Sequence, residues 1–358
     1  MTKVLLYLVK PVIAGLVLAI AIVALSPNLR QQLPNLHLFT SQVERNSFAH
    51  AVQKAGPAVV NIYTRSQINN APNQFQDAGL GSGIIMHEDG YVLTNYHVVA
   101  NADLIFIALQ DGRLGSAVMI GADPWTDLAV LYIDTEGQKL PTIKYDLNRN
   151  TQVGDAVLAI GNPYNLGQTI TQGIISATGR TGLSSGYQDF IQTDAAINQG
   201  NSGGALVDAD GYLVGINTAN FSIGNDNNVG VGINFAIPLQ LAHQVMQKLI
   251  KDGRVIRGHL GVTARPIDPT QARLMGINTG ALISDVDLNG PAARSGIRPN
   301  DVILMLNGEP IASVNSLMDN IAETPPGTEV NITLYRNGKA LQIPVTVGEQ
   351  PPYRGQRR

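Results

Sequence analysis

The sequence predicts a mostly β protein with two folded domains, preceded by an apolar N-terminal helix. The chain has 358 residues, and because a typical domain has about 100–200 residues, two domains are expected. Glycine (37) and proline (19) are plentiful beside a hydrophobic fraction of 44%, which favours short strands and tight turns over helical bundles. Only 14% of the residues are charged and the net charge is -3, so binding to nucleic acid is not expected.

The composition also limits the chemistry. The chain contains no cysteine, which excludes a thiol nucleophile, a thiolate metal site and any disulfide. It has no His-Glu-x-x-His run and no glycine-rich phosphate loop after a strand. Neither a metal nor an organic cofactor is therefore expected.

Residues 4–25, VLLYLVKPVIAGLVLAIAIVAL, are almost entirely apolar. As a helix this segment would be about 33 Å long at about 1.5 Å per residue, which matches the hydrocarbon core of a bilayer. Lys3 and Lys10 lie on its N-terminal side, so the positive-inside rule places residues 1–3 in the cytoplasm. The rest of the chain is then expected across the membrane.

A cleaved signal peptide is the alternative for this segment, because Lys10 could close a charged region before a short apolar run. The only suitable triad, Ala24-Leu25-Ser26, is followed by Pro27, which makes a poor cleavage site. An uncleaved anchor is therefore favoured. Residues 26–47, with two prolines and several Gln and Asn, predict a tether.

A short helix at 48–55 and a series of short strands are expected to form the first folded domain, over residues 48–253. Pro238 opens the last helix of this domain and Gly253 ends it. No long helix interrupts the strands, so antiparallel barrels or a sandwich are expected. The strand segments are 58–64, 81–86, 91–99, 104–109, 127–133, 155–161, 169–177, 190–195, 204–208 and 211–219.

The second domain is expected at residues 258–348, followed by a tail at 349–358. It contains two Asn-Gly pairs, at 307–308 and 337–338, which are the strongest short signal for a β-hairpin turn. One helix is expected near residues 316–322.

The segment INQGNSGGAL, residues 197–206, presents a serine among glycines. A serine hydroxyl is a weak nucleophile unless a base removes its proton, and the base needs an acid to orient it. Of six histidines, only His97 ends an apolar strand of the first barrel. Asp127 precedes a buried-looking run in DPWTDLAVL, and Asp123 could cap the same turn.

The glycines beside Ser202 have a mechanical use. Gly200 and Gly203 permit backbone angles that would direct the amides of Gly200 and Ser202 at one point, where an oxyanion could form. His97, Asp127 and Ser202 also occur in the chain order of the chymotrypsin-type two-barrel proteases. Together these features predict a serine protease.

With LTNYHVV, DPWTDLAVL and NQGNSGGALVD, followed by a PDZ-like segment, the chain resembles the HtrA (Deg) serine proteases from about residue 45 to residue 348. The resemblance implies a chymotrypsin-like double β-barrel followed by one PDZ domain. It also implies that His97 is the base, Asp127 orients it, Ser202 is the nucleophile, and amides around Gly200 form the oxyanion hole.

With an anchor, a single PDZ domain and a short loop at 65–78 between the first strands, the chain resembles the membrane-anchored DegS type more than the degradative DegQ and DegP types. This resemblance implies a homotrimer in the bacterial inner membrane with its domains in the periplasm. It would make the first cut in a membrane-spanning anti-sigma factor when its PDZ domain binds C-termini of unassembled outer-membrane proteins. A degradative protease, or a peptide-binding chaperone with a vestigial triad, remains the alternative.

Specificity and control residues are expected in both domains. Ala196, with Ile197 beside it, corresponds to the pocket floor of chymotrypsin-type proteases and predicts a small apolar side chain before the cut. A PDZ domain holds a C-terminal carboxylate on backbone amides. The carboxylate loop is expected at His259, Leu260, Gly261 and Val262, although DegS-type proteins often have Tyr at the position of His259.

Three further assignments concern regulation. Met318 either lines the pocket for the last peptide side chain or belongs to the core. Arg180 matches the arginine of the family's sensing loop, or is a solvated loop residue. The segment 220–230, NFSIGNDNNVG, is expected to become ordered on activation.

Overall fold

A computed structural model describes residues 11–19, 22, 47–68, 74–162, 167–180, 190–218, 232–277 and 279–353, with only the backbone of Arg180. The chain divides into residues 1–47 and residues 48–358. In the first unit, residues 11–19 are helical. No helix within the described ranges is long and apolar enough to cross a membrane. Most of the expected anchor, residues 4–25, lies outside those ranges.

The first six strands form a closed antiparallel barrel in the order β1-β2-β3-β6-β5-β4. The short helix α3 (Ala49–Ala55) and a 3-10 turn (Gly56–Ala58) precede the barrel, and α4 (Tyr96–Val99) follows β3. Pairing of β1 with β4 closes it. The strands are β1 (Val59–Gln67), β2 (Phe75–Ile85), β3 (Tyr91–Asn95), β4 (Leu104–Ala108), β5 (Leu114–Asp123) and β6 (Leu128–Ile133).

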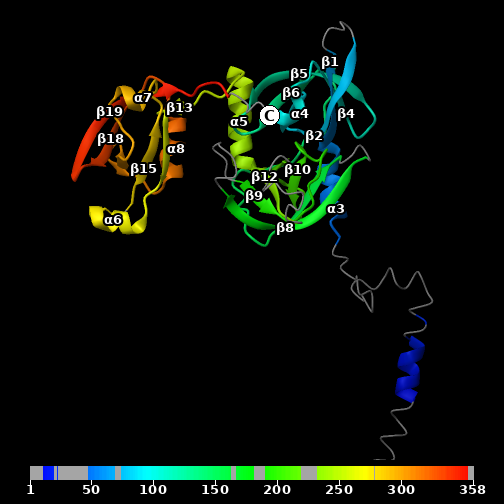
Figure 1. Cartoon of the computed structure of the whole chain (residues 1–358). Helices are drawn as coiled ribbons and strands as arrows, with labels where there is room; N and C mark the ends of the chain where they lie inside the picture. The colour runs from blue at the N-terminus through cyan, green and yellow to red at the C-terminus, as the bar shows by residue number, and fades with distance from the viewer. Residues whose placement is uncertain are drawn as a thin grey trace, which may run out of the picture. The chain divides into compact units, whose positions relative to one another are not determined.

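The next six strands form a second closed barrel in the order β10-β11-β12-β9-β8-β7, which decides between barrels and a sandwich (Figure 1). Pairing of β10 with β7 closes this barrel. The strands are β7 (Ala156–Gly161), β8 (Thr169–Arg180), β9 (Phe190–Thr193), β10 (Ala205–Asp208), β11 (Leu213–Thr218) and β12 (Asn234–Pro238).

The strand boundaries differ from expectation in the first barrel. The expected strand at 91–99 ends at Asn95, and His97 lies in α4 instead of at a strand end. Residues 65–78 were expected to be a loop, but β1 runs to Gln67 and β2 begins at Phe75, so the described ends of this segment pair as hairpin arms. Both arms alternate poorly in hydrophobicity, which hid them in the sequence.

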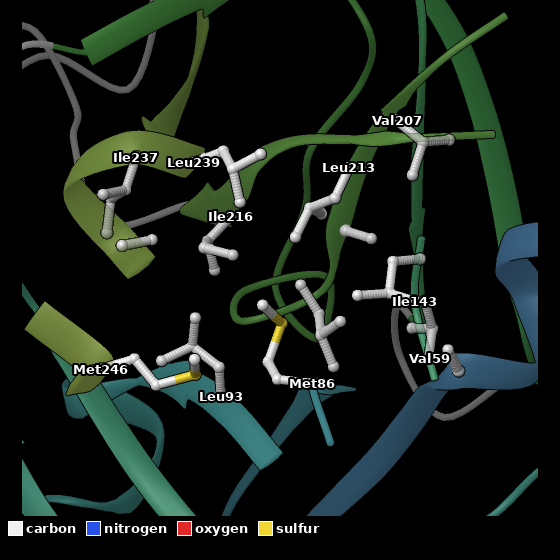
Figure 2. Packing of buried hydrophobic residues seen from close by; sticks show 14 of the residues in the cluster. Val59, Met86, Leu93, Ile143, Val207, Leu213, Ile216, Ile237, Leu239 and Met246 are labelled. Carbon is white, nitrogen blue, oxygen red and sulfur yellow. The ribbon is translucent and has the colours of Figure 1, made fainter. Parts of the chain in front are cut away.

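Helix α5 (Leu239–Asp252) contacts strands of both barrels, β5 and β6 of the first and β11 and β12 of the second (Figure 1). It ends at Gly253, whose φ of 70° is a left-handed conformation that glycine adopts without strain. Its buried face joins one hydrophobic cluster with Leu93 and Met86 from the first barrel and Val207 and Ile216 from the second (Figure 2). The two barrels therefore share this cluster, and each also has an interior cluster of its own.

The C-terminal part, from residue 258, has its own hydrophobic core. Its main sheet has the order β14-β15-β16-β18-β19, with β17 beside β16, and β13 pairs with β20. The expected hairpin turns are confirmed, since Asn307 and Asn337 and the glycine after each have positive φ. The elements are β13 (Gly258–His259), β14 (Val262–Pro266), α6 (Pro269–Met275), β15 (Ala281–Val286), α7 (Pro291–Arg294), β16 (Val302–Leu306), β17 (Glu309–Pro310), α8 (Val314–Glu323), β18 (Glu329–Arg336), β19 (Lys339–Thr346) and β20 (Gly348–Glu349).

Candidate active site

The structure brings His97 and Asp127 into direct contact. Asp127 Oδ2 lies 2.7 Å from His97 Nδ1, and Asp127 Oδ1 accepts a hydrogen bond from the His97 backbone N–H at 2.9 Å. A carboxylate at Nδ1 places the ring proton there and leaves Nε2 as an acceptor. With Nε2 free of a proton, the imidazole can act as a general base.

Asp127 is held by groups from neighbouring strands. Its φ is 55°, a left-handed conformation, and its carbonyl accepts hydrogen bonds from the Asn95 side-chain amide and the Tyr96 N–H. Thr218 Oγ1, at the end of β11, donates to Asp127 Oδ2 at 3.4 Å. The second barrel thus contributes to the position of an acid that belongs to the first.

Asp123, the other acid of this turn, faces different partners. Its two oxygens accept hydrogen bonds from Arg257 Nη1 and Nη2 at 2.8 and 2.6 Å. Thr126 Oγ1 also donates to it, so Asp123 does stabilise the turn that carries Asp127. It is not directed at His97.

Ser202 lies in a tight turn that leads into β10. Gly200 and Gly203 have φ of 101° and 79°, positive values that glycine adopts without strain. The turn is closed by hydrogen bonds from Asn201 N–H to Asn198 C=O and from Gly203 N–H to Asn217 C=O. Within the described residues the Gly200 N–H donates no backbone hydrogen bond, which leaves this donor available to an oxyanion.

The two residues expected at the specificity pocket differ in exposure. Ala196 is exposed, and its carbonyl accepts a hydrogen bond from Thr171 Oγ1 at 2.7 Å. Ile197 is buried in the interior of the second barrel with Ala195, Leu206 and others. Of the two, only Ala196 is therefore open to a substrate side chain. A cavity of about 240 Å³ on the second barrel includes neither residue.

The expected carboxylate loop connects β13 to β14. Leu260 is buried and Gly261 has a φ of 76°. The carbonyls of these two residues accept hydrogen bonds from Ala292 N–H and Asp287 N–H at 2.9 and 2.8 Å, which fixes the path of the loop. Burial lowers the pKa of His259 below its ordinary value, and the nearby Asp287 carboxylate opposes this effect.

The remaining regulatory assignments are only partly described. Met318 is half-buried on α8, next to the buried Leu317. The Arg180 backbone ends β8 and pairs with Phe190, but its side chain lies outside the described part of the structure. The segment 220–230 also lies outside it. Within the described ranges, no cluster of three or more His, Asp or Glu could hold a metal ion.

Several residues of the site were not anticipated from the sequence. Asn95 and Thr218 position Asp127, and Ser82 contacts the turn that carries Ser202. Asn95 lies within the LTNYHVV motif, so its position near His97 was a usable signal. Thr218 and Ser82 are distant in sequence from the residues they contact, and only the strand pairing reveals them.

Comparison with known proteins agrees with this geometry. A trypsin-like peptidase domain family matches residues 81–216 and a PDZ domain family matches residues 258–347. Serine endoprotease DegS of Salmonella typhimurium is 49% identical over 96% of this chain and 98% of its own length. DegS of Haemophilus influenzae is also 49% identical, over 89% of this chain and 92% of its own length.

A solved structure of the HtrA-type protease AlgW with a tripeptide is 46% identical and has a TM-score of 0.78. It covers 86% of this chain, and 99% of that protein's chain is matched. The expected fold, a two-barrel trypsin-like domain followed by a PDZ domain, is therefore confirmed. The chain belongs to the HtrA (Deg) family of serine endopeptidases.

Proposed function

We propose that Ser202 is the nucleophile, His97 the general base and Asp127 the residue that orients it. The contact of 2.7 Å between Asp127 Oδ2 and His97 Nδ1 carries this proposal. As Ser202 Oγ attacks the scissile carbonyl, His97 Nε2 takes the hydroxyl proton and then gives it to the leaving amine. A water molecule, activated by His97 in the same way, then hydrolyses the acyl-enzyme. The N–H groups of Gly200 and Ser202 stabilise the oxyanion in both steps.

The biological role we propose is that of a regulated protease of the envelope-stress response. The substrate is a membrane-spanning anti-sigma factor, and the activators are C-termini of unassembled outer-membrane proteins. The 49% identity to DegS over nearly the full length of both chains supports this role. The apolar segment at 4–25 also supports it. The protein then acts as a homotrimer in the inner membrane, with protease residues 48–253 and PDZ residues 258–348 in the periplasm.

The activating peptide would bind as an added strand, with its carboxylate on the amides of the loop His259–Val262. Met318 would contact its last side chain. The AlgW structure contains a tripeptide, which supports peptide binding here. Activation requires that the peptide bind the active state more tightly than the resting state. We propose that Arg180 and residues 220–230 carry this difference. Ala196, the exposed residue of the expected pocket, would favour a small apolar side chain before the cut.

The test measures cleavage of the periplasmic part of the anti-sigma factor, with and without a peptide ending in Tyr-x-Phe. We expect a large increase in rate with peptide, and no cleavage by Ser202→Ala, which should still bind the peptide. Equal rates with and without peptide would remove the regulatory role. Cleavage of unfolded casein without peptide would favour a degradative protease, and an active Ser202→Ala variant would remove the assigned nucleophile.

A further inference from the structure

Ser82 connects the first barrel to the turn that carries Ser202. It lies on β2 between Gly81 and Gly83 and is fully buried. Its N–H donates to the Ser202 carbonyl at 2.8 Å, and its hydroxyl donates to the Gly200 carbonyl at 2.7 Å. These carbonyls belong to the two residues whose amides are proposed to form the oxyanion hole.

The hydroxyl of Ser82 has a fixed direction. Besides donating to Gly200, Oγ accepts a hydrogen bond from the Asn162 N–H at 3.0 Å, just after β7. The Ser82 carbonyl accepts from Thr94 Oγ1 at 2.7 Å. With one hydrogen to donate and a fixed donor on its lone pair, the hydroxyl is held in the orientation that serves Gly200.

The turn packs closely against this serine. A Cβ added to Gly203 would lie 2.2 Å from the Ser82 carbonyl oxygen. Glycine is also needed beside Ser82, because a Cβ on Gly81 would lie 2.5 Å from Val98 Cγ1 and one on Gly83 would lie 2.8 Å from Val92 Cγ1. The strand and the turn therefore approach each other at backbone distance, and Ser82 supplies the side-chain contact between them.

The Gly200 carbonyl matters because of how its amide is oriented. The N–H of Gly200 belongs to the preceding peptide unit, and its C=O belongs to the following one. At a φ of 101° glycine meets little steric resistance to rotation, so the N–H can turn away unless a neighbouring unit is fixed. The Asn201 N–H, in the same peptide unit as the Gly200 carbonyl, donates to the Asn198 carbonyl at 3.0 Å. The Asn201 side chain adds no anchor, since neither of its buried polar atoms has a hydrogen-bond partner among the described residues, so Ser82 supplies the side-chain contact to this unit.

We propose that Ser82 is a positioning residue of the oxyanion hole. Its hydroxyl fixes the Gly200 carbonyl, so that the Gly200 N–H faces the position of the developing oxyanion. The inference rests on the proposed roles of Gly200 and Ser202. It predicts that loss of the hydroxyl weakens transition-state binding while leaving substrate binding unchanged.

The test compares Ser82→Ala with the wild-type chain, in full length and at saturating activating peptide. Removal of a direct oxyanion donor costs about 10²–10³-fold in kcat; loss of its anchor should cost less, about tenfold or more, with KM changed by less than about twofold. Affinity for a peptide boronic acid, which forms a tetrahedral adduct on Ser202, should fall by a factor similar to that of kcat. Affinity for the uncleaved substrate, measured in a Ser202→Ala background, should not fall.

Thr193→Val is the matched control. Thr193 is fully buried, its hydroxyl donates to the Ile174 carbonyl at 2.7 Å, and it accepts from the Ala195 N–H at 3.1 Å. It has the same bonding pattern as Ser82 but does not contact the turn of Ser202. We expect a comparable loss of thermal stability and a kcat within about twofold of wild type.

Comparison of these variants separates the possibilities. Ser82→Thr keeps the hydroxyl and should recover most of kcat, whereas equal defects in the Thr and Ala variants would overturn the proposal. A kcat loss in Ser82→Ala no larger than that in Thr193→Val, or an unchanged boronic acid affinity, would also overturn it. If Ser202→Ala remained active, the assignment of Ser202 as the nucleophile would be wrong. That conclusion would not depend on the result for Ser82→Ala.

Discussion

At the scale of single residues, Asp127 shows how a backbone conformation positions a functional side chain. A left-handed φ of 55° is unfavourable for most residues, although Asp tolerates it better than others. Two donors, from Asn95 and Tyr96, hold the Asp127 carbonyl in that conformation. The carboxylate then meets both the backbone N–H and the ring of His97. The backbone conformation of Asp127 therefore places its carboxylate against His97, and Thr218 adds a contact from β11.

Asp127→Asn should retain this backbone, because Asn also adopts left-handed conformations. The amide cannot stabilise the imidazolium, and it favours the wrong tautomer of His97, so kcat should fall by about 10⁴-fold with little change in KM. Steady-state kinetics on a peptide substrate checks this. Asp134→Asn is the control, since Asp134 is exposed and only caps the Glu136 N–H. A loss below about tenfold in Asp127→Asn would remove its proposed role.

His259 predicts a dependence of peptide binding on pH. Burial lowers its pKa from the ordinary 6.5, so the imidazole is neutral at pH 7 in the free domain. A peptide carboxylate bound beside it would raise that pKa, because an opposite charge favours the protonated form. Peptide binding would then take up a proton, and affinity should increase as the pH falls from 7.5 toward 5.5. Fluorescence anisotropy with a labelled peptide measures this.

His259→Gln should reduce the pH dependence, and His87→Gln, which changes an exposed histidine paired with Asp89, should not. The stability of the peptide-free domain should change with pH in the opposite direction to its affinity for the peptide. Since the folded pKa of His259 is lowered, the unfolded chain binds more protons below about pH 6.5, and the free energy of unfolding should decrease there. An affinity that is flat with pH, or unaffected by His259→Gln, would contradict this prediction.

The residues predicted from sequence share one property, which is a distinctive local context. Ser202 stands among glycines, and His97 and Asp127 lie in motifs that end or precede apolar runs. Ser82 and Thr218 have no such context. Ser82 meets Gly200 across 118 positions of sequence, so its contact depends on how two barrels are packed and could not be read from its neighbours.

At the scale of elements, the connection between α5 and β13 is tied to the first barrel by a buried ion pair. The side chains of Arg257 and Asp123 are 8% and 3% exposed, and the pair has two hydrogen bonds. Thr126 donates to the same carboxylate. The turn that carries Asp127 is therefore linked to the residue that precedes β13 and the expected carboxylate loop.

Arg257→Ala should reduce the free energy of unfolding by about 3–5 kcal/mol, because it leaves the Asp123 charge buried without a partner. Arg254→Ala is the matched control. The Arg254 pair with Glu349 is 60% and 45% exposed, and exposed pairs contribute about 0–1 kcal/mol. Urea denaturation followed by tryptophan fluorescence compares the two variants. Similar small effects for both would show that water reaches the Arg257 pair.

Elements with strong alternation or clear turn residues were predicted, and the others were not. α5 and the two Asn-Gly hairpins were found because an apolar stripe or a required positive φ marks them. β5 was missed because several of its residues face solvent and it contains Gly115 and Gly121. A strand of this kind is specified by its partners, β4 and β6, more than by its own sequence.

At the scale of the whole molecule, barrel closure could not be predicted from the sequence. Recurrent short strands indicated a barrel or a sandwich, and the choice depends on whether the first strand of a set pairs with a later one. In the structure β1 pairs with β4, and β10 pairs with β7. These are non-local contacts whose register is set by the interior packing, so no segment signals them alone.

The shared core predicts how the molecule unfolds. One buried cluster contains Leu93 of the first barrel and Leu158 of the second. Leu239 and Met246 of α5 belong to the same cluster (Figure 2). A separate cluster, which includes Ile332, forms the core of the C-terminal domain. Each barrel also has an interior cluster of its own. Because neither barrel can unfold without exposing the cluster that it shares with the other, the two barrels should unfold as one cooperative unit, and the PDZ domain should unfold as a second.

Three substitutions test this division by differential scanning calorimetry. Leu93→Ala and Leu158→Ala each create a cavity at a buried site and should destabilise by about 2–5 kcal/mol. Although they lie in different barrels, both should lower the same transition and leave the other unchanged. Ile332→Ala, equally buried, should lower only the other transition. If Leu93→Ala and Leu158→Ala shifted two different transitions, the barrels would unfold independently. The hydrogen bonds from Ser82 to the turn of Ser202 would then have to persist without the support of the shared cluster.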